Sequence, residues 1–281
     1  MDHICYFCHS KAFEGLLERN QIPEEKRRPL IKQFFRMVSE FPDGATAPEL
    51  TRDVQDMIRQ VTGNPDPYTK EKIKSNAALM ELYPELQKKV QKSKNPFDTA
   101  LRLAIGGNII DYGPTQAFDL DGTLDRVLKT PLAIDHSNLL KQKIENAGNI
   151  LYLGDNTGEI VLDKLFIETI GHPNITFVVR DRPILNDATL EDALEIGIDK
   201  VVAQIITNGD DAPSTLLHRT SKSFNDAFYS ADLIISKGMG NLEGLINVKR
   251  ENLFFVLIVK CVHMANLLGV KNGDFIAKLH D

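Results

Sequence analysis

Two short polar segments carry side chains whose types and spacing suit a metal ion. Asp155 and Asn156 are adjacent in the segment LGDNTGE, and Asp187 follows Asp155 by 32 positions. Together they offer two carboxylates and one amide carbonyl, with no histidine or thiolate beside them. Hard oxygen donors of this kind favour Mg²⁺ or Mn²⁺ over tetrahedral zinc. Because three protein ligands leave an octahedral shell incomplete, water and a substrate oxygen have room to bind.

Two lysines that follow later apolar segments provide positive charge for the same chemistry. Lys237 opens the segment KGMGN, and Lys260 comes directly after the apolar run LFFVLIV. Cations that face a metal stabilise the charge on a phosphoryl group during its transfer. Gly238, Gly240 and Asn241 complete a tight turn that would let the backbone approach a ligand closely. Each residue also has an ordinary alternative, as a solvated charge, a turn former or a helix cap.

The elements that must position these residues are predicted from hydrophobic periodicity. Beyond about residue 135, short apolar runs alternate with amphipathic stretches, which is typical of βα units around a parallel sheet. Strands are predicted at 150–153, 175–179, 200–206, 233–236 and 253–259, with a weak last strand near 275–279. Helices are predicted between them at about 158–170, 189–196, 214–229 and 260–268. Ligands of an open parallel sheet bind beyond the carboxyl ends of its strands, where the candidate residues fall.

The first part of the chain has a different periodicity and is predicted to be all-helical. A helix after Pro23 places its apolar residues on one face, and further helices are expected at about 47–62, 69–91 and 97–105. The breaks GNPDP and KNP separate the last three. The predicted organisation is a helical N-terminal subdomain over residues 1–112 and an α/β metal-binding catalytic core over residues 113–281.

Composition limits the classes of partner. The net charge of −6 leaves no broad basic surface for a nucleic-acid backbone, so nucleic acid is not expected as a partner. The longest apolar run has seven residues, far fewer than the roughly 20 that cross a bilayer, so no membrane association is expected. The first residues contain no basic leader followed by an apolar stretch, which predicts a cytoplasmic protein. Three cysteines form no disulfide framework, and reduced thiols are expected.

The motifs resemble those of the damage-control phosphatases, earlier known as domain of unknown function 89. The segments LGDNTGEIVLDKL, RDRPILNDAT, ISKGMGNLEGL and KCVHMANLLGV are similar, in order, to successive blocks of that family. GGNIIDYG at residues 106–113 resembles the block ahead of the sheet, so the resemblance spans nearly the whole chain. It implies a three-layer α/β/α, Rossmann-like core of parallel strands with an all-helical N-terminal subdomain.

The resemblance also implies roles for individual residues. Asp155, Asn156 and Asp187 would hold one divalent ion of Mn, Mg, Co or Ni. The substrate phosphate would be contacted by Lys237, Gly238, Met239, Gly240, Asn241 and Lys260. Asp155, Asn156 and Lys237 would be the catalytic residues, with the metal binding a phosphate oxygen and acidifying a water for in-line attack. The implied function is a divalent-metal-dependent phosphatase that hydrolyses small phosphorylated metabolites, either sugar phosphates or damaged or overflow phosphometabolites.

Some positions carry an expectation and an alternative. Asn108 and Asp111 occupy the block that closes the family's pocket from the helical side, and they are expected to face the substrate, although a helix exit needs similar residues. Cys5 and Cys8 resemble a pair in the microbial branch of the family. With nearby histidines they could bind a metal, but a single CxxC favours packing of two small apolar thiols. The physiological substrate, preferred metal, general base and oligomeric state are left open.

Three other functions compete with this interpretation. FDLDGTL at 118–124 reproduces the nucleophile motif of haloacid-dehalogenase-like phosphatases, with Asp119 as nucleophile, and GDD at 209–211 resembles their acidic pair. YGPTQA precedes that motif, however, where a buried apolar strand is required. LYLGDNTGE resembles the first motif of S-adenosylmethionine-dependent methyltransferases, but Asp155 and Asn156 stand where small residues are needed. A non-catalytic protein that binds phosphorylated metabolites would need the lysines without an open metal.

Overall fold

The computed structural model describes residues 1–107 and 120–280. The helices in this part of the chain are α1 (His3–Arg19), α2 (Glu24–Ser39), α3 (Ala47–Thr62), α4 (Thr69–Lys92), α5 (Pro96–Gly106), α6 (Leu120–Lys129), α7 (Ser137–Asn146), α8 (Glu159–Ile170), α9 (Leu190–Glu195), α10 (Lys222–Ser230), α11 (Met239–Leu245) and α12 (Val262–Leu268), with a 3₁₀ turn at Ile198–Lys200. Among the described residues, no helix has the length and apolar character needed to span a membrane.

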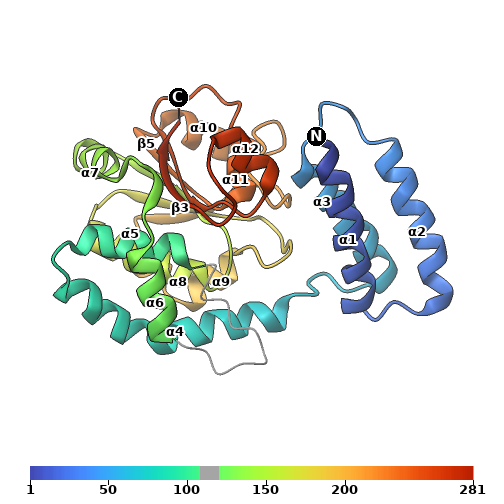
Figure 1. The fold of residues 1–281 in the computed structure, drawn as a ribbon, viewed down its shortest axis with the longest axis horizontal. Helices are drawn as coiled ribbons and strands as arrows, with labels where there is room; N and C mark the ends of the chain where they lie inside the picture. Colours follow the sequence, from blue (N-terminus) through green and yellow to red (C-terminus); the bar gives the residue numbers. More distant parts are fainter. Residues whose placement is uncertain (108–119, 281) are drawn as a thin grey trace.

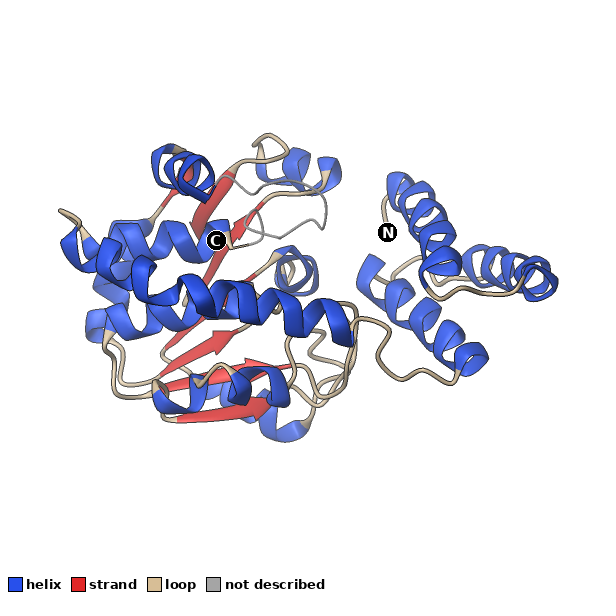
Figure 2. Cartoon of the chain, turned by 90° about the horizontal axis from the view of Figure 1, so that it is seen from below, coloured by secondary structure: helices blue, strands red, loops and turns tan. Residues whose placement is uncertain are grey.

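The described strands form one seven-stranded sheet in the order β1-β7-β6-β5-β2-β3-β4 (Figure 2). They are β1 (Leu132–Asp135), β2 (Ile150–Leu153), β3 (Ile175–Val179), β4 (Gln204–Thr207), β5 (Leu233–Lys237), β6 (Leu253–Ile258) and β7 (Phe275–Leu279). Strands β2 to β6 pair in parallel, whereas β7 is antiparallel to β6 and parallel to β1. The carboxyl ends of β2 to β6 therefore share one edge of the sheet.

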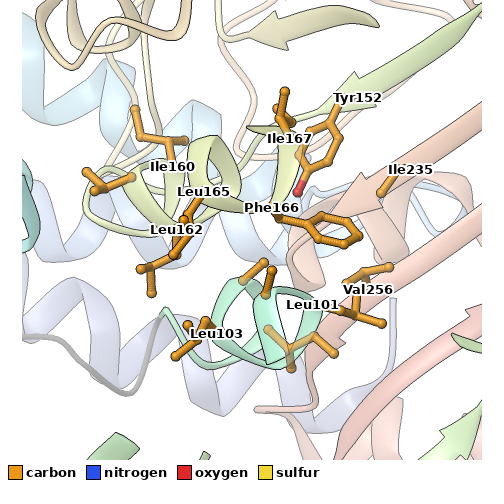
Figure 3. Close-up of a cluster of buried hydrophobic side chains, with 14 of the residues drawn as sticks. Leu101, Leu103, Tyr152, Ile160, Leu162, Leu165, Phe166, Ile167, Ile235 and Val256 are labelled. Carbon is orange, nitrogen blue, oxygen red and sulfur yellow. The ribbon is translucent and has the colours of Figure 1, made fainter. Parts of the chain in front are cut away.

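Helices cover both faces of the sheet (Figures 1 and 2). On one face, α5 and α8 contribute Leu101 and Phe166 to a hydrophobic cluster that also contains Ile235 of β5 (Figure 3). On the other face, α10 and α11 contribute Phe224 and other side chains to a second cluster, which contains Ile234. Successive side chains of a strand point to opposite faces, so β5 joins the two clusters. The predicted three-layer α/β/α fold class is confirmed.

Helices α1 to α3 have a hydrophobic cluster of their own. The rings of Phe13 and Phe34 stack there with centroids 4.3 Å apart, and Leu50 and Ile58 of α3 are fully buried beside them. These helices lie to one side of the sheet and its covering helices (Figures 1 and 2). Helices α4 and α5, predicted within the helical subdomain, share the hydrophobic cluster of the sheet: α5 packs on β6 and β7, and α4 packs on α5 and α8. The boundary predicted at residues 112 and 113 lies outside the described residues, and the hydrophobic cluster changes earlier, between α3 and α4.

Most predicted strands are confirmed, and the differences have physical reasons. Strands β2, β3, β5 and β6 are almost completely buried, so each appears in the sequence as a continuous apolar run. β4 begins at Gln204 rather than near residue 200, because a 3₁₀ turn precedes it. β1 was not predicted, since its four residues alternate between half-buried and exposed at the sheet edge. Helix α10 begins at Lys222, where Ser221 caps its first turn.

Candidate active site

A cleft of about 500 Å³ lies between the carboxyl edge of the sheet and the α1–α3 helices. The loops that follow β2 and β3 contribute Asp155, Asn156 and Asp187 to its lining. Helix α1 faces them with several side chains, which include Cys5 and Cys8. All three residues predicted from the sequence as metal ligands therefore face one cavity. The volume is within the range of pockets that bind small metabolites, roughly 300–1,000 Å³.

Backbone contacts hold the β2 and β3 loops together. Asn156 and Asp187 form an isolated antiparallel bridge, and the amide of Thr157 donates to the carbonyl of Asn186 at 2.9 Å. The amide of Ala188 donates to the carbonyl of residue 155 at 2.8 Å. In addition, Asn156 donates its Nδ2 to Oδ2 of the Asp155 carboxylate at 2.8 Å. Residues 32 positions apart in the sequence thus share one rigid polar cluster.

A buried arginine orients the two carboxylates. Arg180, at the end of β3, donates from Nε to Oδ2 of Asp187 at 2.7 Å, and its Nη2 lies 3.7 Å from Oδ1 of Asp155. Its Nη1 donates to the carbonyl of Ser214 at 2.8 Å, and the same Nη2 donates to Oδ1 of Asn241 at 3.0 Å. Arg180 was missed in the sequence, although a charged residue directly after the apolar run ITFVV is a signal that could have identified it.

Asn241 was predicted to contact the substrate phosphate, but its side chain does not line the cleft. Its side chain is fully buried, and its Nδ2 donates to the carbonyls of Gly154 at 3.2 Å and Lys237 at 2.8 Å. Its Oδ1 accepts from Arg180 and from Thr215. Asn241 instead joins the ends of β2 and β5 to the arginine that orients the carboxylates.

The glycine turn after β5 lies directly against Asp155. A Cβ atom on Gly238 would lie 1.9 Å from Oδ2 of that carboxylate, and the φ of Gly238 is +78°, a conformation that favours glycine. Gly238, Met239 and Gly240 all line the cleft, as does Lys260 after β6. The turn therefore lets the backbone approach Asp155 closely, whereas the sequence predicted an approach to a ligand.

Lys237 faces away from the cleft. It has no exposed surface, and its ammonium donates to the carbonyl of Ala104 at 2.8 Å, to Glu159 at 2.5 Å and to Asp163 at 2.7 Å. Side chains alternate along β5, so Lys237 points to the same face as Ile235, towards α5 and α8. This differs from the predicted contact with a phosphate, because the described residues that line the cleft do not include Lys237.

The buried groups at this edge carry an excess of negative charge. Desolvation raises the pKa of Asp155 well above its usual value, and the charges of Asp187 and Glu159 raise it further. Desolvation also raises the pKa of Asp187. Burial raises the pKa of Asp163 to about 6, although the nearby Lys237 opposes this shift. Two buried cations, Arg180 and Lys237, pair with these four buried carboxylates and leave an excess of about two negative charges. A third buried cation, Lys72, lowers the pKa of Asp187 but is itself paired with Asp192.

A divalent cation fits this donor set. Asp155 and Asp187 supply carboxylate oxygens and Asn156 supplies an amide, the ligand types that Mg²⁺ and Mn²⁺ prefer. A doubly charged ion would neutralise the excess that raises the two pKa values. The described residues contain no group of three or more His, Cys, Asp or Glu side chains placed to hold a metal. Cys5 and Cys8 therefore belong to no such group, although both line the cleft and neither forms a disulfide.

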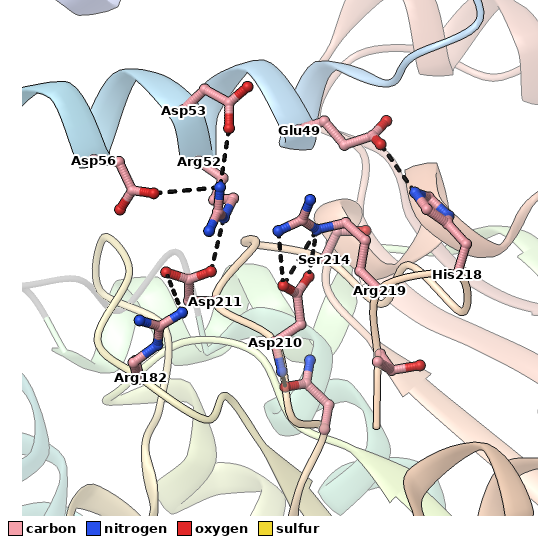
Figure 4. A network of polar contacts seen from close by, with 12 residues as sticks. Glu49, Arg52, Asp53, Asp56, Arg182, Asp210, Asp211, Ser214, His218 and Arg219 are labelled. Atoms are coloured by element: carbon pink, nitrogen blue, oxygen red, sulfur yellow. Dashed lines mark hydrogen bonds and ion pairs between the residues drawn. The ribbon is translucent and has the colours of Figure 1, made fainter. Parts of the chain in front are cut away.

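Ion pairs hold α3 against the sheet edge (Figure 4). Arg52 of α3 donates from Nε to Oδ1 of Asp211 at 2.8 Å, and Arg182 lies 3.3 Å from the same carboxylate. Burial alone would raise the pKa of Asp211, but these arginines outweigh it and lower the pKa. Asp210 accepts from Arg219 at 3.1 Å. Both acids of the GDD segment are therefore paired with arginines.

Three candidates from the sequence are not placed. Asn108 and Asp111, expected to face the substrate, and Asp119, the nucleophile of the dehalogenase-like alternative, lie outside the described residues. Helix α5 ends at Gly106, and Lys237 donates to the carbonyl of Ala104 in its last turn, on the side of the sheet away from the cleft.

Comparison with known proteins identifies the family. A model of the damage-control phosphatase ARMT1-like domain matches residues 1–276. A damage-control phosphatase of Pyrococcus horikoshii is 31% identical over 277 residues, which cover 97% of this chain and 95% of the relative. One of Archaeoglobus fulgidus is 33% identical over 228 residues, which cover 79% of this chain and 78% of the relative.

A solved structure supports the same assignment. The crystal structure of a DUF89 family protein from Pyrococcus horikoshii matches this chain with a TM-score of 0.92 at 29% sequence identity. The match covers 100% of this chain and 99% of that chain. The resemblance found in the sequence is thereby confirmed, and the chain belongs to the family defined by the damage-control phosphatase ARMT1-like domain.

Proposed function

We propose that this protein is a divalent-metal-dependent phosphatase that hydrolyses small phosphorylated metabolites in the cleft at the sheet edge. The observation that carries the proposal is the pair of buried carboxylates, Asp155 and Asp187, which a backbone bridge holds together with Asn156. The buried groups around them carry an excess of about two negative charges. The relatives from Pyrococcus horikoshii and Archaeoglobus fulgidus, both named damage-control phosphatases, support the reaction class.

Asp155, Asn156 and Asp187 would hold the ion in this proposal. A divalent ion supplies Lewis-acid polarisation of a phosphate and a more acidic water. Arg180 keeps the two carboxylates oriented, because its guanidinium bonds Asp187 and lies beside Asp155. Helices α1 and α3 form the wall opposite these residues, which limits the access of bulk water and strengthens electrostatic interactions in the cleft.

Lys260 is the cation that we assign to the substrate phosphate. It follows β6, it is exposed, and it lines the same cleft as the carboxylates. Its charge also opposes the raised pKa of Asp155, although desolvation and two carboxylates have larger effects. We assign Lys237 a positioning role, because its ammonium is already bonded to Glu159 and Asp163 behind the carboxylate cluster.

Phosphate release should depend on both the metal and Asp155. Purified protein should hydrolyse phosphorylated metabolites with Mg²⁺, Mn²⁺, Co²⁺ or Ni²⁺, and a chelator should abolish the activity. Asp155→Asn removes one charge from the cluster and should lower kcat/KM by about 100-fold or more. Asp181→Asn is the matched control, because Asp181 is exposed in the loop after β3 and should retain activity. A phosphatase screen and metal-binding calorimetry measure both effects.

Other results would support the competing functions. Loss of turnover in Asp119→Asn with full activity in Asp155→Asn would contradict the proposal and favour a dehalogenase-like mechanism. Binding of phosphate esters that is insensitive to chelator, without turnover, would favour a non-catalytic binding protein. Tight binding of S-adenosylmethionine without metal would favour a methyltransferase.

Gly238→Ala should weaken metal binding through Asp155. The new Cβ would lie 1.9 Å from the carboxylate, which must then move, and the apparent metal affinity should fall by about 10-fold or more. Gly269→Ala is the control, since its φ of +69° imposes a similar backbone strain but no atom lies within 4 Å of the new Cβ. Calorimetric titration with Mn²⁺ compares the two variants. Equal metal affinities in the two variants would contradict the predicted contact.

Lys237→Met should destabilise the fold in a pH-dependent manner. Removal of a buried ammonium leaves Glu159 and Asp163 without their cation, which costs about 3–5 kcal/mol. Protons neutralise buried carboxylates more readily at low pH, so the loss should be larger near pH 8 than near pH 5. Urea denaturation at both pH values measures the difference. Lys222→Met, at an exposed lysine paired with Asp226, should change stability little at either pH, and equal losses in the two variants would exclude the proposed role.

A further inference from the structure

One acidic side chain in the cleft has no part in the cluster described above. Glu243 lies on α11, one helical turn after Met239, and both side chains line the cleft. The adjacent side of α11, one residue further round the helix, is packed closely. A Cβ on Gly240 would lie 2.1 Å from the carbonyl of Pro213, and one on Gly244 would lie 2.3 Å from the Ser214 hydroxyl. This close packing fixes the backbone of α11 against the segment that contains Pro213 and Ser214.

Glu243 differs from the other acids of the cleft in lacking a partner. Arg180 bonds Asp187 and lies near Asp155, whereas Glu243 makes no hydrogen bond or ion pair with any residue in 1–107 or 120–280. Burial raises its pKa to about 7. Glu243 is half-buried, so its carboxylate is only partly solvated and has no compensating bond to the described residues. Such a group suits a ligand that supplies the missing bond.

The surroundings of Glu243 explain both its raised pKa and its access to a ligand. The adjacent groups from α1 and from the segment after β6 are the side chains of Cys5 and Cys261. A second cavity of about 330 Å³ shares these residues and Glu243 with the cleft. Besides Glu243 and the carboxylates of Asp155 and Asp187, the charged groups that border the two cavities are Lys260, Asp2 and the amino terminus at residue 1. Asp2 lies 3.3 Å from His263. Glu243 therefore stands where the two cavities meet, in a largely apolar wall.

The position along α11 separates Glu243 from the phosphate end of the cleft. Gly238, whose Cα abuts the Asp155 carboxylate, lies five residues earlier, which corresponds to about 7.5 Å along a helix. A phosphate bound at Asp155 would thus leave Glu243 near the group to which the phosphate is esterified. A carboxylate at that distance repels a second anion and accepts hydrogen bonds from donors.

We propose that Glu243 is a specificity-determining residue that binds a hydrogen-bond donor, either a hydroxyl or an ammonium, on the leaving group of the substrate. The inference rests on the proposed phosphatase function and adds the chemical class of its substrate. Leaving groups that end in an alkyl group cannot satisfy the carboxyl, and those that carry a second phosphate or carboxylate are repelled by it. Both classes bind less well.

Three phosphate esters of nearly equal size test this assignment. 2-Hydroxyethyl phosphate, 2-aminoethyl phosphate and propyl phosphate differ only in the terminal hydroxyl, ammonium or methyl. Near pH 8, above the pKa of about 7, wild-type protein should show kcat/KM for at least one donor ester about 10-fold or more above that for propyl phosphate. Glu243→Met should reduce that ratio towards one. Glu243→Gln should retain the preference for the hydroxyl ester and lose any preference for the ammonium ester.

The controls separate this inference from the phosphatase function and from a structural role. Glu251→Met, at an exposed glutamate in the turn before β6, should keep the wild-type ratios. Glu243→Met should keep or raise the melting temperature, because it removes a half-buried acid that has no partner among the described residues. If no ester were hydrolysed with any metal, the phosphatase proposal would fail, and the same ratios taken from calorimetric Kd values would still decide the role of Glu243. Wild-type ratios near one, or ratios unchanged in Glu243→Met, would overturn the inference.

Discussion

The mutual proximity of two buried carboxylates is the constraint on which this structure depends. Asp155 and Asp187 lie on separate loops, and each raises the free energy of ionising the other in a place with little water. Arg180 offsets only one of these two negative charges. Behind the pair, Lys237 likewise offsets only one of the two charges of Glu159 and Asp163. The remaining negative charge favours either bound protons or a divalent ion, and it faces a cleft of metabolite size.

The rest of the fold holds this arrangement in place from three directions. The parallel strands β2, β3 and β5 end side by side, which brings their loops to one edge. Asn241 joins two of those strand ends to Arg180, and Gly238 leaves space for the carboxylate of Asp155. Helices α1 to α3, with a hydrophobic cluster of their own, are tied to the sheet loops by Arg52 and Asp211. They supply the wall that turns an open sheet edge into a cleft.

Much of the fold and part of the site could be predicted from the sequence. Strands buried on both faces appear as apolar runs, and polar residues in the loops after two such runs identified the three metal-ligand candidates. The direction of Lys237 could not be predicted, because it depends on the alternation within β5 and on Glu159, 78 positions away. Arg180 and Asn241 are 61 positions apart, and their contact arises only when the strands pair. The exposed edge strand β1 has no apolar run that would identify it.

The central claim is that one cation binds between the carboxylates of Asp155 and Asp187. The most direct test is a crystal structure of the protein soaked in Mn²⁺, with an anomalous difference map recorded above the manganese absorption edge. The account predicts a single strong peak in the cleft, within roughly 2.0–2.6 Å of an oxygen of each carboxylate. A map without a peak between these carboxylates, or with manganese bound only elsewhere on the protein, would contradict it.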